Sequence, residues 1–272
     1  MSATMGAKTT APNGPGPGAA TAALQSFAVL CSLIALWWLA SHGQWISKVF
    51  LPTPEATLSS LGEGLNLMGQ TGGELAAFTR DTVQRMVLGW LFASAGGVVL
   101  GAAIGMSAAA RAWILPTLEF IRPLPASAVL PLAISIFGLS PGMVLFVVAF
   151  GAMWPVLLAT IYGFANVNPS LREVAAGLQM SKTAFVFKIG LPSAMPDILA
   201  GMRLSLTIAL IVAVVGEMIA SQSGLGQAIL MAARSFRSSE LFAGIVLLGL
   251  IGFISNALLA LAERRLLKWQ TQ

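Results

Sequence analysis

The chain has 272 residues, of which 57% are hydrophobic and 9% are charged, with a formal net charge of +5. Soluble domains of this size carry about 25% charged residues, so this composition excludes a soluble globular protein and predicts an integral membrane protein. One cysteine (Cys31) and one histidine (His42) exclude an intrachain disulfide, a cysteine or histidine metal site and a catalytic triad. Because the basic residues are scattered near the ends of apolar segments, we expect contact with an anionic membrane face and no nucleic-acid partner.

The chain opens with a polar stretch over residues 1–22 that is rich in Ala, Thr, Gly and Pro. Such a composition buries too little apolar surface to fold, so we expect a disordered tail. The stretch lacks the basic start and the small-residue cleavage site of a secretory signal, so we expect the apolar run that follows to stay attached. Residues 23–272 are then expected to form one transmembrane domain.

Six apolar segments follow, each close to the roughly 20 residues that a helix needs to cross a bilayer. They lie at about residues 24–41, 83–105, 113–137, 143–162, 198–220 and 241–261. The sequence therefore predicts an all-α polytopic membrane protein with about six transmembrane helices. Pro123, Pro125 and Pro131 interrupt the third segment. We expect this span to be kinked, with irregular backbone that lines a cavity.

Two of the predicted spans carry a stripe of mostly small residues at every fourth position, which allows another helix to approach closely. The first stripe comprises Gly89, Ala93, Gly97, Gly101 and Gly105, and the second Gly201, Ser205, Ala209, Ala213, Glu217 and Ser221. We expect both to be packing seams. Glu217 lies near the outer end of its span, so a gate or a hydrogen bond between helices is the favoured role, rather than direct contact with a solute.

Residues 168–192 form the long polar interruption in the second half of the chain, with the charged residues Arg172, Glu173, Lys182 and Lys188. Asn168 predicts the start of one helix, which carries Leu171, Val174, Ala175 and Leu178 on one face. Ser181 predicts the start of a second helix, which we expect to end at Gly190 and Pro192. Two short amphipathic helices between spans suit docking onto another protein.

Seven residues of this hairpin match a known motif in type and spacing: Glu173, Ala175, Ser181, Phe185, Ile189, Leu191 and Pro192. The segment resembles the EAA loop of ABC importer permeases, which forms a cytoplasmic coupling helix seated in a cleft of the ATPase subunit. The resemblance implies an ATPase-coupling role for Glu173, Ala175, Gly177, Ser181, Phe185, Leu191 and Pro192. Gln179 stands where the family usually has glycine, and Gly177 lies two residues too early to replace it. The geometry of the bend between the two helices therefore stays open.

A second resemblance is carried by Arg122-Pro123-Leu124-Pro125, together with Phe137-Gly138. These residues are similar to the same segment in permeases of the taurine, aliphatic sulphonate, nitrate and bicarbonate branch. Over about residues 24–268 the chain therefore resembles the permease subunit of an ABC importer, with the type I importer fold. The solute expected on this basis is a small anion.

The resemblance also implies partners and a location. We expect a second permease copy, two copies of an ATP-binding subunit that hold ATP and Mg, an extracytoplasmic solute-binding protein, and no cofactor in this chain. The expected location is a bacterial-type inner membrane, with both termini and the hairpin cytoplasmic. A modest excess of basic residues on that side favours the same orientation.

Three charged residues lie within predicted spans: Glu119, Arg122 and Glu217. Each is costly, by about 2.5 to 3.5 kcal/mol at the bilayer centre, so each needs a partner or a function. Two roles are possible for Arg122: it attracts an anionic solute, or it forms a structural ion pair with Glu119, three residues earlier. Together with Pro123, Pro125 and Glu217, it makes up the candidate translocation pathway or gate.

Two other classes of protein are alternatives. A self-sufficient secondary transporter or channel is disfavoured because the spans contain few buried acids, no histidine relay and no obvious internal repeat. An intramembrane enzyme is disfavoured because the sequence lacks paired carboxylates at metal spacing and a serine with a base. We therefore expect no catalytic residue and no metal site in this chain.

Overall fold

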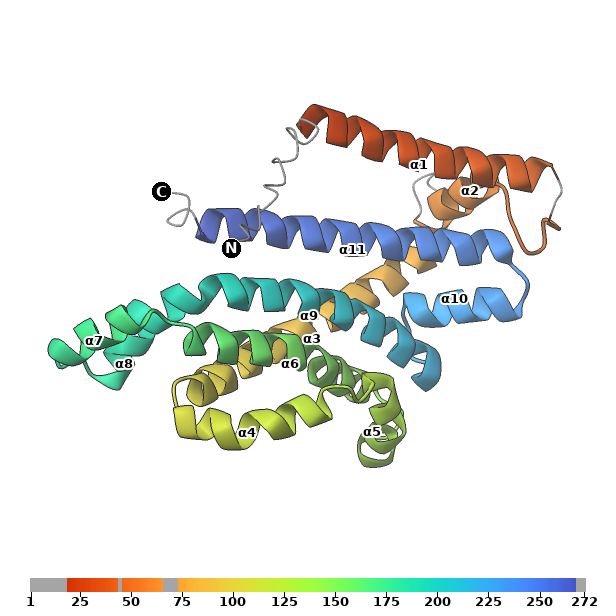
Figure 1. Ribbon diagram of the computed structural model, residues 1–272. Helices are drawn as coiled ribbons and strands as arrows, with labels where there is room; N and C mark the ends of the chain where they lie inside the picture. The colour runs from red at the N-terminus through yellow and green to blue at the C-terminus, as the bar shows by residue number, and fades with distance from the viewer. Residues whose placement is uncertain (1–18, 44–45, 66–72, 268–272) are drawn as a thin grey trace, which may run out of the picture.

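The computed structural model describes residues 19–43, 46–65 and 73–267, and the regular elements within these ranges are helices (Figure 1). In chain order they are α1 (Ala19–His42), α2 (Pro54–Gly64), α3 (Glu74–Gly105), α4 (Ala108–Ile121), the 3₁₀ helix η1 (Ala126–Val129), α5 (Leu130–Phe137), α6 (Pro141–Ala165), α7 (Pro169–Gly177), α8 (Lys182–Phe185), the π-helix η2 (Val186–Gly190), α9 (Leu191–Ala220), α10 (Leu225–Arg234) and α11 (Ser238–Leu266). Most of the predicted tail, residues 1–18, lies outside the described ranges, while residues 19–22 belong to α1.

Five helical stretches are long and apolar enough to cross a membrane, namely α1, α3, α6, α8 to α9, and α11. The third predicted span is a pair of helices, α4 and η1–α5, bent by 84° at the break between them. The break falls at Pro123 and Pro125, whose missing N–H groups and restricted backbone end α4. The kink predicted from the prolines is therefore a complete break. Figure 1 shows that this bent pair still runs from the end of the bundle where α3 stops to the end where α6 begins.

Helices α3, α6 and α9 form the packed centre of the molecule, and small residues bring their backbones together. A Cβ atom built on Gly97 of α3 would lie 2.9 Å from the Cβ of Val156 on α6. A Cβ atom on Gly201 of α9 would lie 2.6 Å from the Cβ of Ala159 on the same α6. Both predicted packing seams are confirmed, except that Ser221 is exposed and ends α9 in a left-handed conformation.

The hairpin after α6 begins as the sequence predicts. The side chain of Asn168 accepts a hydrogen bond from the backbone N–H of Ser170, and that of Ser181 accepts one from the N–H of Ala184. The predicted end of the second helix is wrong, because the chain stays helical from Lys182 to Ala220. Pro192 lies in the first turn of α9, and the wider π-turn of η2 directly before it accommodates the missing N–H without ending the helix.

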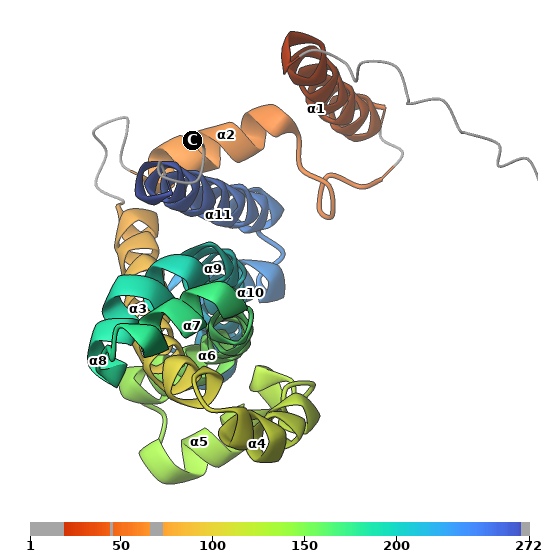
Figure 2. The ribbon, with the colours of Figure 1, turned by 60° about the vertical axis from the view of Figure 1, so that its left-hand side comes forward.

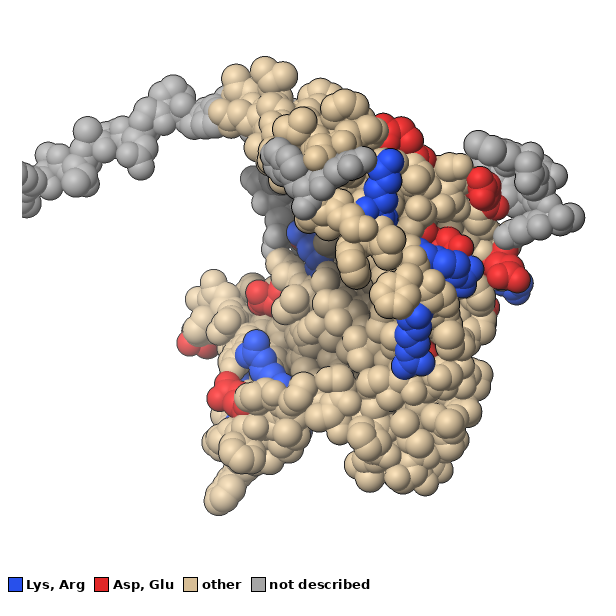
Figure 3. Space-filling model, turned by 90° about the vertical axis from the view of Figure 1, so that its right-hand side faces the viewer, with Lys and Arg blue, Asp and Glu red and all other residues tan. Residues whose placement is uncertain are grey.

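Helix α1 lies apart from the packed centre (Figure 2). The side chains described from Leu24 to Leu36 are exposed, and contacts form near the end of the helix. Trp37 stacks on Phe242 at the start of α11, and Trp38 donates a 2.9 Å hydrogen bond to Glu55 of α2. In Figure 1, α2 and α10 lie toward the end of the bundle opposite α7 and α8. Seen from that side, acidic and basic side chains are mixed in the upper part of the surface and at its left edge, whereas the lower right part shows neither (Figure 3).

Candidate functional site

Helices α7 and α8 project at one end of the bundle, beyond the packed centre (Figure 1). Helix α7 ends with two hydrogen bonds, from Met180 N–H to the carbonyl of Ala175 and from Gln179 N–H to that of Ala176, both 3.0 Å long. This pair of bonds is the Schellman arrangement, whose central residue is left-handed and usually glycine. Gln179 occupies that position with φ of 50°. The bend left open by the sequence is therefore made at Gln179 itself.

The hairpin presents both apolar and charged groups to its surroundings. Leu171, Val174 and Leu178 have exposed fractions of 41%, 56% and 70%. Ala175, which was expected on the same face, is instead buried. Of the remaining predicted coupling residues, Glu173, Gly177 and Ser181 are exposed, and Phe185, Leu191 and Pro192 are half-buried. A surface of this kind, with large apolar side chains beside a free carboxylate, is suited to a protein partner.

One charged residue of the hairpin, Arg172, is hydrogen-bonded to the packed centre. The Nη2 atom of Arg172 donates hydrogen bonds to the carbonyls of Phe164 and Ala165, over 2.6 and 3.2 Å. These carbonyls belong to the last turn of α6, where backbone acceptors lack partners within the helix and a positive charge is favourable. From the sequence alone, Arg172 is predicted only as one of the charged residues of the hairpin. The signal that could have found it is a basic residue placed shortly after the end of an apolar span.

The broken span lines a cavity of about 410 Å³. Its walls come from the break before η1, from α6 and from α9, and include Arg122, Pro123, Pro125, Gly151, Trp154, Pro155, Leu204, Ile208, Ile211 and Val212. Arg122 is the charged member of this lining. The structure thus brings together three of the four residues predicted for the pathway or gate, and the prediction that irregular backbone lines a cavity is confirmed.

The alternative reading of Arg122, an ion pair with Glu119, is wrong. The ion pairs in the described part of the chain are Arg85–Glu217, Arg203–Glu263 and Arg237–Glu240. Glu119 instead accepts a hydrogen bond from the hydroxyl of Tyr162 on α6. Its carboxylate therefore has a partner on a neighbouring helix, and Arg122 at the end of α4 remains beside the cavity.

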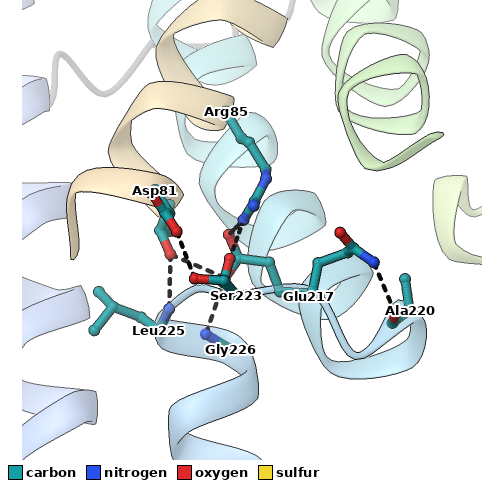
Figure 4. Close-up of polar contacts among 9 residues, drawn as sticks. Asp81, Arg85, Glu217, Ala220, Ser223, Leu225 and Gly226 are labelled. Atoms are coloured by element: carbon teal, nitrogen blue, oxygen red, sulfur yellow. Dashed lines mark hydrogen bonds and ion pairs between the residues drawn. The ribbon is translucent and has the colours of Figure 1, made fainter. Parts of the chain in front are cut away.

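Glu217 lies away from this cavity, in a buried polar cluster at the far end of α9 (Figure 4). Its carboxylate accepts hydrogen bonds from Arg85 Nη1 (2.7 Å), from Thr82 Oγ1 (2.9 Å) and from the backbone N–H of Gly226 (3.0 Å). Thr82 in turn accepts from the N–H of Leu225, over 2.8 Å. The predicted hydrogen bond between helices is present, since Thr82 and Arg85 belong to α3.

The same cluster fixes the loop between α9 and α10. Arg85 also donates to the carbonyl of Ser223, and the hydroxyl of Ser223 donates to Asp81 over 2.5 Å (Figure 4). The side chains of Arg85 and Glu217 are only 12% and 0% exposed. Sequence reasoning missed Arg85, although an arginine and a glutamate at matching ends of two predicted spans indicate an ion pair when both side chains must leave water.

Comparisons with known proteins show to which protein family the chain belongs. Residues 97–268 match the family described as "Binding-protein-dependent transport system inner membrane component". The chain belongs to this family. Among its relatives, the putative aliphatic sulfonates transport permease of Bacillus subtilis (strain 168) is 33% identical over 238 residues, or 88% of this chain and 84% of the relative. The taurine transport system permease of Escherichia coli (strain K12) is 29% identical over 244 residues, or 90% and 89%.

A third relative of this permease is the nitrate import permease of Leptolyngbya laminosa, 30% identical over 184 residues, or 68% of this chain and 66% of the relative. Among solved structures, an inward-facing methionine ABC transporter matches with a TM-score of 0.64, 16% identity, and coverage of 71% of this chain and 95% of that chain. The structural match confirms the predicted importer permease fold. The predicted resemblance to the sulphonate, taurine and nitrate branch is also confirmed, and the protein is a multi-pass inner-membrane component of a transport system.

Proposed function

We propose that two copies of this permease form the translocation pathway of an ATP-driven importer and that separate ATP-binding subunits, one on each α7–α8 hairpin, hold ATP and Mg. An extracytoplasmic binding protein delivers the solute to the opposite end. The observation that carries this proposal is the exposed apolar and acidic surface of the hairpin at the end of a bundle of this family. Closure of the ATP-binding subunits would move the hairpins and turn the pathway outward.

The hairpin side is assigned to the cytoplasm. In Figure 1 the last turn of α11 lies toward the same end of the bundle as α7 and α8, and α1 begins with the end of the helix that faces that side. Arg264 and Arg265 in the last turn of α11 supply positive charge there. Positive residues flanking spans are retained on the cytoplasmic side, which supports cytoplasmic termini for this chain.

The solute is proposed to be a small anion such as a sulphonate, taurine or nitrate. The relatives named above are permeases for aliphatic sulfonates, taurine and nitrate, which share a negatively charged group. In this chain Arg122 offers one positive charge to a cavity that is otherwise lined by apolar and uncharged residues. A single charge in apolar surroundings attracts an anion strongly, because the local dielectric constant is low.

Glu217 is proposed to act at an outer gate, through the loop that it holds rather than through the solute. Its cluster ties α3 and α9 to the start of α10. A change in the outer end of the pathway would have to move these three elements together or break their shared hydrogen bonds. The gate therefore depends on the Arg85–Glu217 pair as a unit.

Reversal of one charge on the hairpin tests the coupling role. We expect Glu173→Lys to reach the membrane in normal amount but to lose copurification with the ATP-binding subunit and to lower solute uptake by more than roughly tenfold, because a reversed charge in an interface costs several kcal/mol. The control is Glu63→Lys on α2, an exposed glutamate at the opposite end, which should leave copurification unchanged. Wild-type uptake by Glu173→Lys would exclude this residue from the coupling interface.

A further inference from the structure

Phe164, in the last turn of α6, is a meeting point of four elements. Its side chain is 1% exposed and packs with Ala194 and Ile198 of α9. A Cβ atom built on Gly105, the last residue of α3, would lie 2.8 Å from the Cβ of Phe164. One on Gly190 in η2 would lie 2.6 Å from the ring atom Cε1. Its carbonyl accepts the hydrogen bond from Arg172 of α7.

Both arms of the hairpin therefore touch the same residue. The first arm, α7, is attached through the guanidinium of Arg172 to the backbone of Phe164. The second arm, α8, continues into η2, whose last residue Gly190 lies against the Phe164 ring. Because the helix is continuous from Lys182 to Ala220, the second arm is also the beginning of a membrane span.

The reason for a glycine at position 190 is local. Its φ of −62° is ordinary helical backbone, so conformation does not require glycine there. The requirement is space, because any side chain would occupy the place of the buried ring. The π-turn at 186–190 coincides with this contact, and such turns inside longer helices frequently occur at functional sites. The contact therefore fixes both the path of the helix and its distance from α6.

We infer that Arg172, Phe164 and Gly190 form a joint that transmits movement of the α7–α8 hairpin to α3, α6 and α9. The inference rests on the proposed function of the hairpin. These three residues are positioning residues, and none of them lines the cavity at Arg122. Helices α6 and α9 do line it, through Trp154 and Ile208 among others, so a rotation of either helix at the joint changes the cavity.

The joint predicts a specific loss of coupling. In liposomes that contain the full importer with its ATP-binding subunit and binding protein, the measured quantity is the amount of taurine, aliphatic sulphonate or nitrate, whichever the wild type takes up, that is transported per ATP hydrolysed. Gly190→Ala places a methyl group against the ring and should lower this ratio at least roughly fivefold, the small end of allosteric coupling. Arg172→Gln should also lower this ratio. Arg172→Lys, which keeps a positive charge and a hydrogen-bond donor, should give a ratio between those of Arg172→Gln and the wild type. Gly249→Ala on α11, where an added Cβ meets open space, is the control and should behave as wild type.

A compensating pair separates coupling from folding. Phe164→Leu removes the ring atoms that the Gly190→Ala methyl would meet, so the double variant should transport more solute per ATP than Gly190→Ala alone. If Gly190→Ala fails to fold, the two Arg172 variants carry the same test. The joint would be overturned if the variants bind the ATP-binding subunit and lose thermal stability but transport as much solute per ATP as the wild type. Failure of the wild-type permease to bind an ATP-binding subunit would instead overturn the proposed function itself.

Discussion

At the scale of single residues, the placement of charge follows from the cost of removing it from water. Glu217 is fully buried, and its three hydrogen-bond donors come from α3 and from the start of α10. Arg122 has no carboxylate partner among the described ion pairs and lines a cavity instead. The two residues have different environments, and their variants should therefore fail in different ways.

Loss of Arg85 should destabilise the protein, because Glu217 would be left as a buried charge without a cation. We expect Arg85→Met to cost about 3 to 5 kcal/mol, seen as a marked fall in the thermal midpoint of the purified permease. Adding Glu217→Gln removes the orphaned charge, so the double variant should be more stable than Arg85→Met alone. Equal midpoints for wild type and both variants would mean that the pair contributes nothing to stability.

The gate role of Glu217 is tested separately by the single variant Glu217→Gln. This variant should alter solute-stimulated ATPase activity, and an unchanged activity would count against the gate.

Replacement of Arg122 should affect transport and leave folding intact, because the side chain is exposed to a cavity and holds no ion pair. We expect Arg122→Gln to be present in the membrane at the wild-type level and to lower uptake of an anionic solute by roughly tenfold, the scale of electrostatic focusing in a cleft. Arg264→Gln, an exposed arginine at the end of α11, serves as the matched control. Uptake assays with sulphonates, taurine and nitrate provide the measurement, and normal transport by Arg122→Gln would refute the anion role.

At the scale of helices, sequence reasoning succeeded where one local interaction decides the outcome. Asn168 and Ser181 cap helices as their types predict, and the four-residue stripes of small residues form the seams between α3, α6 and α9. It failed at Gly190 and Pro192, where packing against Phe164 and a π-turn carry the helix through two residues that usually end one. Gln179 likewise adopts a conformation that its type disfavours, because the hydrogen bonds that close α7 require it.

The seam between α3 and α6 can be tested with two glycines of the same helix. A Cβ atom on Gly101 would lie 2.6 Å from the Cβ of Thr160 and 2.8 Å from the carbonyl oxygen of Leu157, so Gly101→Ala should cost about 1 to 3 kcal/mol through overpacking. On Gly96 the nearest atom is the sulfur of Met153 at 3.9 Å, so Gly96→Ala should be neutral or stabilising. Thermal unfolding in detergent checks both. If the glycine seam does not limit how closely α3 and α6 approach, Gly101→Ala and Gly96→Ala should change thermal stability equally.

At the scale of the whole molecule, the sequence supplied the membrane class, the number of apolar segments and the position of the hairpin. It could not supply which side chains meet across the bundle, since Thr82, Arg85 and Glu217 come from distant parts of the chain. For the same reason, the sequence did not predict the hydrogen bond from Arg172 to α6 or the one from Tyr162 to Glu119. Pairings of this kind depend on helix rotation and depth, which a hydropathy pattern leaves undetermined.

We propose that the α7–α8 hairpin is where the ATP-binding subunit is held. A photo-crosslinking amino acid at Val174, whose side chain is 56% exposed on α7, tests it most directly, with the same probe at Leu58 of α2, 64% exposed at the other end, as the control. In cells that produce the whole importer, the probe at position 174 should crosslink to the ATP-binding subunit, and the probe at position 58 should not. A crosslink to that subunit from position 58, with none from position 174, would show that the α7–α8 hairpin is not the binding surface.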